Sequence, residues 1–232
     1  GQKLSLKRAD RDAKEGVVYA MVSADGKKGV VIRLSSETDF VAKNEDFVNL
    51  AKEFTQIALD TFPADLETLL KQPYQNITIG EKVSEQVGVI GEKIELADYQ
   101  HIEAPQVVSY IHMGNKAGVI LGLNNADAKF RDAGRDVAMQ VAAMKPVALD
   151  KDGVDASIIE KEIEIGKELA RQEGKPEDML EKIALGKLNR FFKDNTLLAQ
   201  AFVKDNSLSV EAYLKSMDKD LTVTAFKHVK LG

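Results

Sequence analysis

The sequence contains one pattern twice, and this repeat constrains the fold more than any other feature. The first copy has two β-branched runs, at 17–22 and 30–34. The Asp-Gly pair between them suits a tight turn that needs positive φ. A shift of 89 positions leads to a second pair of runs, at 107–112 and 118–123. The shift superposes these residues of the first and second copies: Val18 and Val107, Val22 and Ile111, Gly29 and Gly118. We therefore predict two related β-hairpins.

A segment with helical periodicity follows each hairpin. Apolar residues recur at three- and four-residue spacing over 47–58, and a second periodic stretch covers 128–143 before Lys145-Pro146. That spacing is typical of an amphipathic helix, and the residue before a proline avoids the helical region. Shorter helices are predicted over 64–70 and 78–90. The predicted fold class is α+β, with two related subdomains, each a small antiparallel sheet with helices on one face.

The later part of the chain predicts a different element. Narrow apolar stripes run over 156–171 and 177–192, with Gly174-Lys175-Pro176 between them. Glycine often ends a helix and proline suits the first turn of the next, so we predict a projecting antiparallel helical (coiled-coil) hairpin. Two short helices and a strand that returns to the second sheet are predicted after it: 197–202, 210–216 and 221–229.

These elements divide the chain into four predicted parts. Residues 1–15 are a charged lead-in, and 16–104 are the N-terminal core subdomain. The hairpin takes 156–195. The C-terminal core subdomain is split around it, into 105–155 and 196–232.

Composition excludes several classes of function. The chain has no cysteine, and its three histidines lack metal-ligand spacing, so we expect no metal and no disulfide. The sequence shows no phosphate-binding loop and no clustered acid, base or nucleophile, so we expect no cofactor and no enzyme activity. A net charge of −5 disfavours direct nucleic-acid binding. No apolar run approaches the roughly 18 residues of a membrane span, and we expect a cytoplasmic protein with no membrane partner.

The junction between the first hairpin and its helix is the most distinctive stretch, with Thr38-Asp39-Phe40-Val41 at its centre. It is two residues longer than the matching junction of the second copy, and we place the extra residues at Thr38-Asp39-Phe40. Local pattern leaves two interpretations. Thr38 or Asp39 caps the helix and Phe40 packs back as a hydrophobic staple, or Phe40 protrudes toward a partner.

The junction resembles the signature of the elongation factor Ts family, which has a Thr-Asp-Phe-Val-Ala run where a strand meets a helix. Further matches occur in family order along nearly the whole chain, in these stretches: 81–94, Ser109-Tyr110-Ile111-His112, 138–146, Gly174-Lys175-Pro176 and 200–205. Members of the family usually begin with a small helical domain. The resemblance implies a chain that starts after that domain.

The resemblance implies a guanine nucleotide exchange factor for elongation factor Tu, which promotes release of GDP and magnesium without covalent catalysis. In the family picture, Phe40 enters an apolar slot of the GTPase and Asp39 makes polar contacts near the metal. The resemblance implies these partner-binding residues: Thr38, Asp39, Phe40, Val41, Ile90, Gly91, His112 and Val203. Val203 would contact a β-barrel domain of the partner.

The hairpin matches the projecting coiled coil of the family, for which the resemblance implies self-association as a homodimer. The alternative function is a non-catalytic scaffolding protein that dimerises through this hairpin and in which Phe40 only staples a helix.

Overall fold

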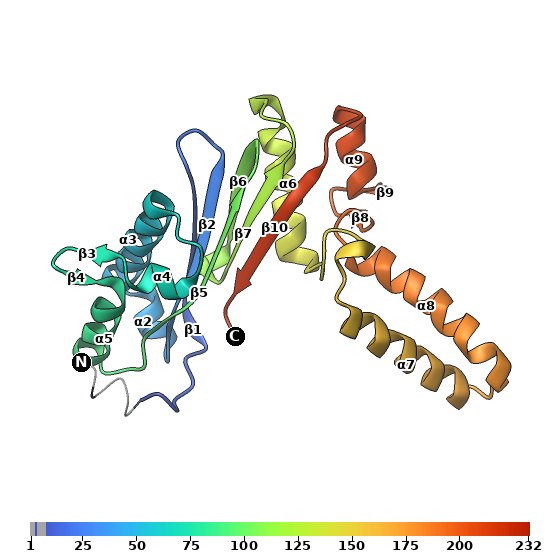
Figure 1. Ribbon diagram of the computed structural model, residues 1–232, viewed down its shortest axis with the longest axis horizontal. Coiled ribbons are helices and arrows are strands. Elements are labelled where there is room, and N and C mark those ends of the chain that lie inside the picture. Colours follow the sequence, from blue (N-terminus) through green and yellow to red (C-terminus); the bar gives the residue numbers. More distant parts are fainter. Residues whose placement is uncertain (1–2, 4–7) are drawn as a thin grey trace. The chain divides into compact units, whose positions relative to one another are not determined.

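The computed structural model describes residue 3 and residues 8–232, so the start of the predicted 1–15 lead-in lies outside the described residues. The described chain forms two compact units (Figure 1). The first contains the residues up to Ala142 together with the C-terminal Val223–Gly232. The second is Ala143–Thr222.

Two three-stranded antiparallel sheets form the centre of the first unit. In order across each sheet, the strands are β1 (Glu15–Val22), β2 (Lys28–Ser36) and β5 (Glu95–Glu103), then β6 (Gln106–His112), β7 (Ala117–Leu123) and β10 (Val223–Lys230). Both predicted hairpins are confirmed, and the last strand joins the second sheet as expected. The predicted α+β class with two related sheets is therefore correct.

The strand β5 is not predicted from the sequence, because its buried residues do not alternate. Leu96, Tyr99 and Ile102 are buried at three-residue spacing. A bulge shifts the register opposite Arg33 and Leu34, and the extra residue places Leu96 and Tyr99 in the same core cluster. A strand interrupted in this way lacks the period of two on which sequence patterns rest.

The pairing register confirms the duplication. In the first sheet Val22 pairs with Gly29, and in the second Ile111 pairs with Gly118, the residues that the shift of 89 superposes. A helix follows each hairpin: α3 (Glu45–Thr61) or α6 (Arg131–Met144). The third strand of each sheet then lies beside the second strand of its hairpin.

The two copies differ in what is inserted between that helix and the third strand. The first copy has a small set of elements there: α4 (Leu66–Leu70), β3 (Pro73–Tyr74), β4 (Ile77–Thr78) and α5 (Ile79–Ile90). The second copy has the whole of the second compact unit at the same point of the chain. The insertion leaves the sheet order unchanged, since β10 returns to β7 as β5 returns to β2.

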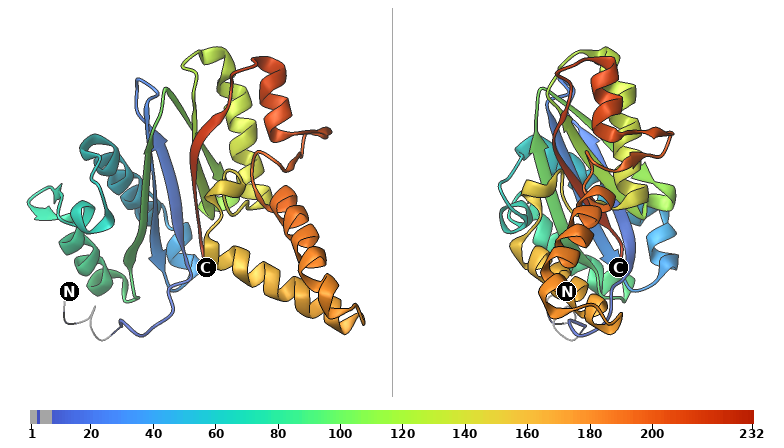
Figure 2. Two further views of the ribbon diagram at one scale, coloured as in Figure 1. Left: turned by 45° about the vertical axis from the view of Figure 1, so that its right-hand side comes forward. Right: turned by 90° about the vertical axis from the view of Figure 1, so that its right-hand side faces the viewer.

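The two sheets pack face to face through glycines at equivalent positions, with α3 and α6 on their outer sides (Figure 2). A Cβ atom on Gly29 would lie 2.6 Å from Val107 Cγ1, and one on Gly118 would lie 3.0 Å from Val18 Cγ1. The shift of 89 exchanges these two contacts. The interface between the sheets therefore has an approximate two-fold symmetry, and each glycine makes room for a valine of the other copy.

The second unit contains the predicted helical hairpin, formed by α7 (Ala156–Gln172) and α8 (Leu180–Asn195) with the 3₁₀ turn η4 (Glu177–Met179) between them. The two helices approach closely, since a Cβ on Gly166 would lie 3.1 Å from Ala184 Cα. Leu169 and Met179, which the apolar stripe would bury, are exposed. Gly166, Ala170 and Ala184 are small and buried and let the backbones come together, whereas Leu169 and Met179 face solvent.

The predicted helix over 197–202 is wrong. The backbone N–H groups of Leu197 and Leu198 donate to the carbonyl oxygens of Ala148 and Leu149, each at 3.0 Å, and not to their own helix. The segment then forms β8 (Ala201–Phe202), which pairs with β9 (Asp205–Ser209) before α9 (Val210–Met217). Long-range backbone pairing overrides the local helical pattern here. No helix in the described part of the chain has the length and hydropathy of a membrane span.

Substitution of Gly29 tests the contact between the sheets. Gly29→Ala is expected to lower the free energy of unfolding by about 1–3 kcal/mol, the usual cost of overpacking a core. Val107→Ala removes the methyl group that the new Cβ would meet. In the double variant the two costs should therefore not add. Urea unfolding measures all three variants, and costs that add within about 0.5 kcal/mol would rule out the direct contact.

Candidate partner-binding site

The junction after β2 folds into a separate short helix, α2 (Asp39–Lys43). Thr38 is its N-cap, and its Oγ1 accepts a hydrogen bond from the backbone N–H of Val41 at 3.4 Å. Asn44 ends α2 and begins α3, because its backbone N–H donates to Val41 O while its side chain accepts from the N–H of Asp46. Two caps in succession keep α2 distinct from α3.

Comparison with the second copy shows which side of α2 faces the core. The shift of 89 superposes Thr38 on Asp127, which caps the 3₁₀ turn η2 (Ala128–Phe130), and Val41 on Phe130. Phe130 is buried, at 2% exposure, and Val41 packs against the first core cluster. Phe40 is 83% exposed. Val41 therefore points inward as Phe130 does, and the interpretation of Phe40 as a staple is wrong.

The two extra residues of the first junction lie after Val41 and not at Thr38-Asp39-Phe40, as the sequence had suggested. The shift stays at 89 positions through both N-caps. It becomes 87 within the following helices, where buried Leu50 corresponds to buried Val137. The extra residues extend η2 of one copy into the full turn of α2 in the other.

Phe40 lies beside the end of α5, although 50 positions separate it from Ile90. Val89, at 72% exposure, is the other large apolar side chain that faces solvent here. Phe40, Val89 and Ile90 line a shallow pocket of about 340 Å³. The other residues that line it are Val41, Asn44, Asp46, Phe47 and Gln86. The tertiary structure therefore brings Phe40 and Val41 of one predicted site segment together with Ile90 of the other around one pocket.

The turn at the end of α5 depends on Gly91. This residue has φ of +83°, a conformation that favours glycine, and its N–H donates to Val87 O at 3.1 Å. The chain reverses there and brings Glu92 back toward the start of α2. Gly91 is thus a structural requirement for the position of Ile90.

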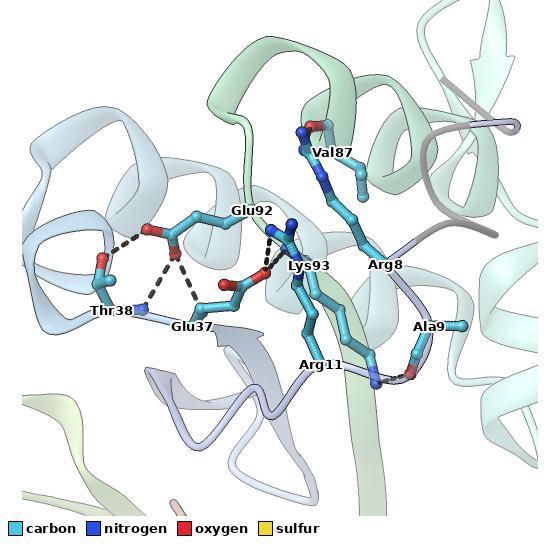
Figure 3. A network of polar contacts seen from close by, with 8 residues as sticks. All are labelled: Arg8, Ala9, Arg11, Glu37, Thr38, Val87, Glu92 and Lys93. Carbon is cyan, nitrogen blue, oxygen red and sulfur yellow. Dashed lines mark hydrogen bonds and ion pairs between the residues drawn. The ribbon is translucent and has the colours of Figure 1, made fainter.

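Glu92 connects this turn to α2 (Figure 3). Its Oε1 accepts hydrogen bonds from the backbone N–H groups of Glu37 and Thr38, both at 3.0 Å, and its Oε2 accepts from Thr38 Oγ1 at 2.7 Å. A carboxylate that accepts several such bonds makes strong, directional contacts. The negative charge also lies near the N-terminus of α2, where it is favourable.

Residues 37–232 match the family model described as Elongation factor TS. The chain belongs to the elongation factor Ts family. It is 53% identical over its full length to elongation factor Ts of Christiangramia forsetii, of which it covers 84%. It is 50% identical to elongation factor Ts of Flavobacterium psychrophilum and 52% to that of Cytophaga hutchinsonii, and it covers 84% of each. The family model and these names make it a translation elongation factor.

The remaining site residues that the elongation factor Ts resemblance implied lie elsewhere. His112 ends β6, and its Nδ1 lies 2.9 Å from Tyr110 Oη. The 3₁₀ turn that follows, η1 (Met113–Asn115), lies against β1, the strand that α2 also contacts. Val203 is in the second unit, between β8 and β9, and is 51% exposed.

Asp39 is exposed, and its carboxylate forms an ion pair with Lys43 Nζ at 3.2 Å, one turn along α2. Exposed pairs of this kind contribute little stability, so the carboxylate can exchange Lys43 for a partner group at low cost. No group of three or more His, Asp or Glu side chains among the described residues is arranged to hold a metal ion.

Sequence reasoning missed Val89 and Glu92. A signal for Val89 was present, because the buried residues of α5, Ile79, Val83 and Val87, are four apart and leave Val89 off that face. No local pattern could have found Glu92, since its partners are more than 50 positions away along the chain.

Each of the two junctions contains one phenylalanine, exposed Phe40 in the first copy and buried Phe130 in the second, and the pair gives a stability test. Phe40→Ala is expected to change the free energy of unfolding by less than about 1 kcal/mol, as surface substitutions do. Phe130→Ala removes a buried ring and is expected to cost about 3–5 kcal/mol. Urea unfolding of the two variants under the same conditions makes the comparison. A loss at Phe40 as large as that at Phe130 would mean that Phe40 belongs to the core.

Proposed function

We propose that this chain is a guanine nucleotide exchange factor for elongation factor Tu, and that it promotes the release of GDP and magnesium. The observation that carries this proposal is Phe40. Its large apolar side chain lies on a capped helix and faces solvent. The equivalent position of the second copy has the polar Lys129. An exposed aromatic beside a shallow apolar pocket is typical of a surface that binds another protein.

Such a factor needs no covalent chemistry. It must bind the nucleotide-free GTPase more tightly than the nucleotide-bound form, and linkage then requires it to weaken nucleotide binding by the same factor. Burial of one aromatic side chain supplies about 1.5–3 kcal/mol, enough to shift an element with two states of similar free energy. The chain therefore acts as a ligand of the GTPase and not as an enzyme.

The proposed roles follow from where the residues lie. Phe40 enters an apolar slot of the GTPase, and Asp39 gives up Lys43 to interact with polar groups near the magnesium ion. Thr38 and Val41 hold α2, through its cap and through the core. The further partner contacts are made by Ile90, Gly91, His112 and Val203.

Contacts from both compact units would anchor the GTPase at more than one point. Val203 in the second unit would bind a separate domain of the partner, so that Phe40 acts within an already formed complex. Linking two contacts in this way raises the effective concentration of the second.

We also propose that the helical hairpin mediates self-association as a homodimer. Four large apolar side chains of the hairpin, three on its helices and Met179 in the turn η4, are 42–45% exposed: Ile165, Leu169, Met179 and Leu185. The four-part division of the chain into 1–15, 16–104, 105–155 with 196–232, and 156–195 remains part of this proposal, as does a cytoplasmic location. The scaffolding alternative requires this dimer without any effect on a GTPase.

Release of fluorescent GDP from elongation factor Tu tests the proposal. The wild-type chain is expected to accelerate release. Phe40→Ala is expected to lower that acceleration by roughly 30-fold, the factor for a loss of about 2 kcal/mol at a binding hot spot. Leu185→Ala, which truncates an exposed apolar residue of the hairpin, is the matched control and should leave release unchanged. Acceleration that Phe40→Ala does not alter would exclude the proposed wedge.

A further inference from the structure

The carboxylates of Glu37 and Glu92 link the loop before α2 to the loop after α5 (Figure 3). In one direction, Glu92 accepts from the backbone N–H groups of Glu37 and Thr38. In the other direction, Glu37 Oε1 accepts from the backbone N–H of Lys93 at 2.7 Å. Each loop therefore binds the main chain of the other. Contacts to backbone atoms on both sides fix the position of the two loops, and not only of their side chains.

The segment before β1 adds contacts around these two loops. Lys93 Nζ donates to Ala9 O at 2.7 Å, and Arg8 Nη1 donates to Val87 O on α5 at 2.9 Å. Arg11 Nη1 lies 3.5 Å from Glu37 Oε1, with its side chain 54% exposed. An exposed pair at that distance is weak. The backbone contacts of Glu92 and Glu37 are therefore the main link between the loops.

In the second copy, Gln106 Nε2 of β6 donates to the carbonyl oxygens of Asn125 and Asp127 at 3.1 and 3.0 Å, but the N–H groups of the equivalent junction have local partners. There the N–H of Asp127 donates to Asn125 Oδ1 at 2.9 Å, and the N–H of Lys129 donates to Asp127 Oδ1 at 3.0 Å. These partners are two positions apart. In the first copy, the matching N–H of Thr38 donates to a glutamate 54 positions away. Because local side chains suffice to bind the N–H groups of such a junction, capping of these groups alone does not explain Glu92.

We propose that Glu92 is a positioning residue for the partner surface. It holds α2 against the end of α5, so that Phe40, Val89 and Ile90 meet the GTPase as one preformed surface. This inference deepens the proposed exchange function and rests on it. A surface that is already ordered loses less conformational entropy on binding. Without Glu92, Phe40 remains exposed but is no longer fixed relative to Ile90.

A double-mutant cycle on GDP release from elongation factor Tu tests this role in the full chain. Glu92→Ala is expected to lower the efficiency of exchange about tenfold, equal to about 1.4 kcal/mol, when Phe40 is present. In the Phe40→Ala background it should change exchange by less than about twofold, because the ring to be positioned is absent. Glu92→Gln keeps an oxygen acceptor for the two backbone N–H groups and should retain most of the activity.

Glu81→Ala is the matched control. Glu81 completes the capping box at the opposite end of α5, where its Oε1 accepts from the N–H of Thr78 at 3.2 Å. Loss of the Glu81 side chain should lower the free energy of unfolding without changing the rate of GDP release. Amide hydrogen exchange of the free protein should be faster at Thr38 in Glu92→Ala, and unchanged there in Glu81→Ala.

The outcomes separate this inference from the function on which it rests. The inference would be overturned if Glu92→Ala slowed GDP release equally in the wild type and in Phe40→Ala. It would also be overturned if Glu81→Ala slowed GDP release as much as Glu92→Ala does. Either result would mean that Glu92 only stabilises the fold. Normal exchange by Glu92→Ala, with Phe40→Ala impaired, would overturn the inference alone. Normal exchange by Phe40→Ala would overturn both.

Discussion

The contact between the two sheets at Gly29 and Gly118 is the constraint on which the rest of the first unit depends. Each glycine leaves room for a valine of the other copy, so the sheets meet through the same surface. Each sheet then has only its opposite face free for a helix, and α3 and α6 take those faces. The same packing sets the β6–β7 turn, with His112 at its start, against β1, which α2 also contacts.

Duplication of this kind separates the residues that hold the fold from those that are free to change. The sheets, their register and the inward positions of Val41 and Phe130 are common to both copies. The differences lie at the junction before the helix and in the insertion after it. The core positions are filled in the same way in both copies. One copy can therefore have a different surface, since the core does not depend on that surface.

The surface around Phe40 combines exposed apolar side chains with a backbone that is held in place. Its apolar side chains face water, and the backbone that carries them is held by a half-buried carboxylate from another part of the chain. Exposed apolar area is unfavourable for solubility, so its presence on an ordered helix argues for a partner. Order in the free protein makes each buried side chain more effective, because less entropy is lost when the partner binds.

The sequence by itself determined the repeated hairpins, their helices, the α+β class and the family, because periodicity and turn residues act over a few positions. It also singled out the Thr38 to Val41 junction and the Ile90-Gly91 turn. Only the tertiary structure decided that Phe40 and Ile90 line one pocket and that Val41 and not Phe40 points inward. It also decided that residues 197–198 pair with 148–149 and residues 201–202 with β9 instead of forming a helix. The contacts of Glu92 and the place of β5 were likewise decided by the tertiary structure. Apart from the pairing with β9, the deciding contact in each of these cases joins residues far apart in the chain, and local pattern carries no information about such contacts.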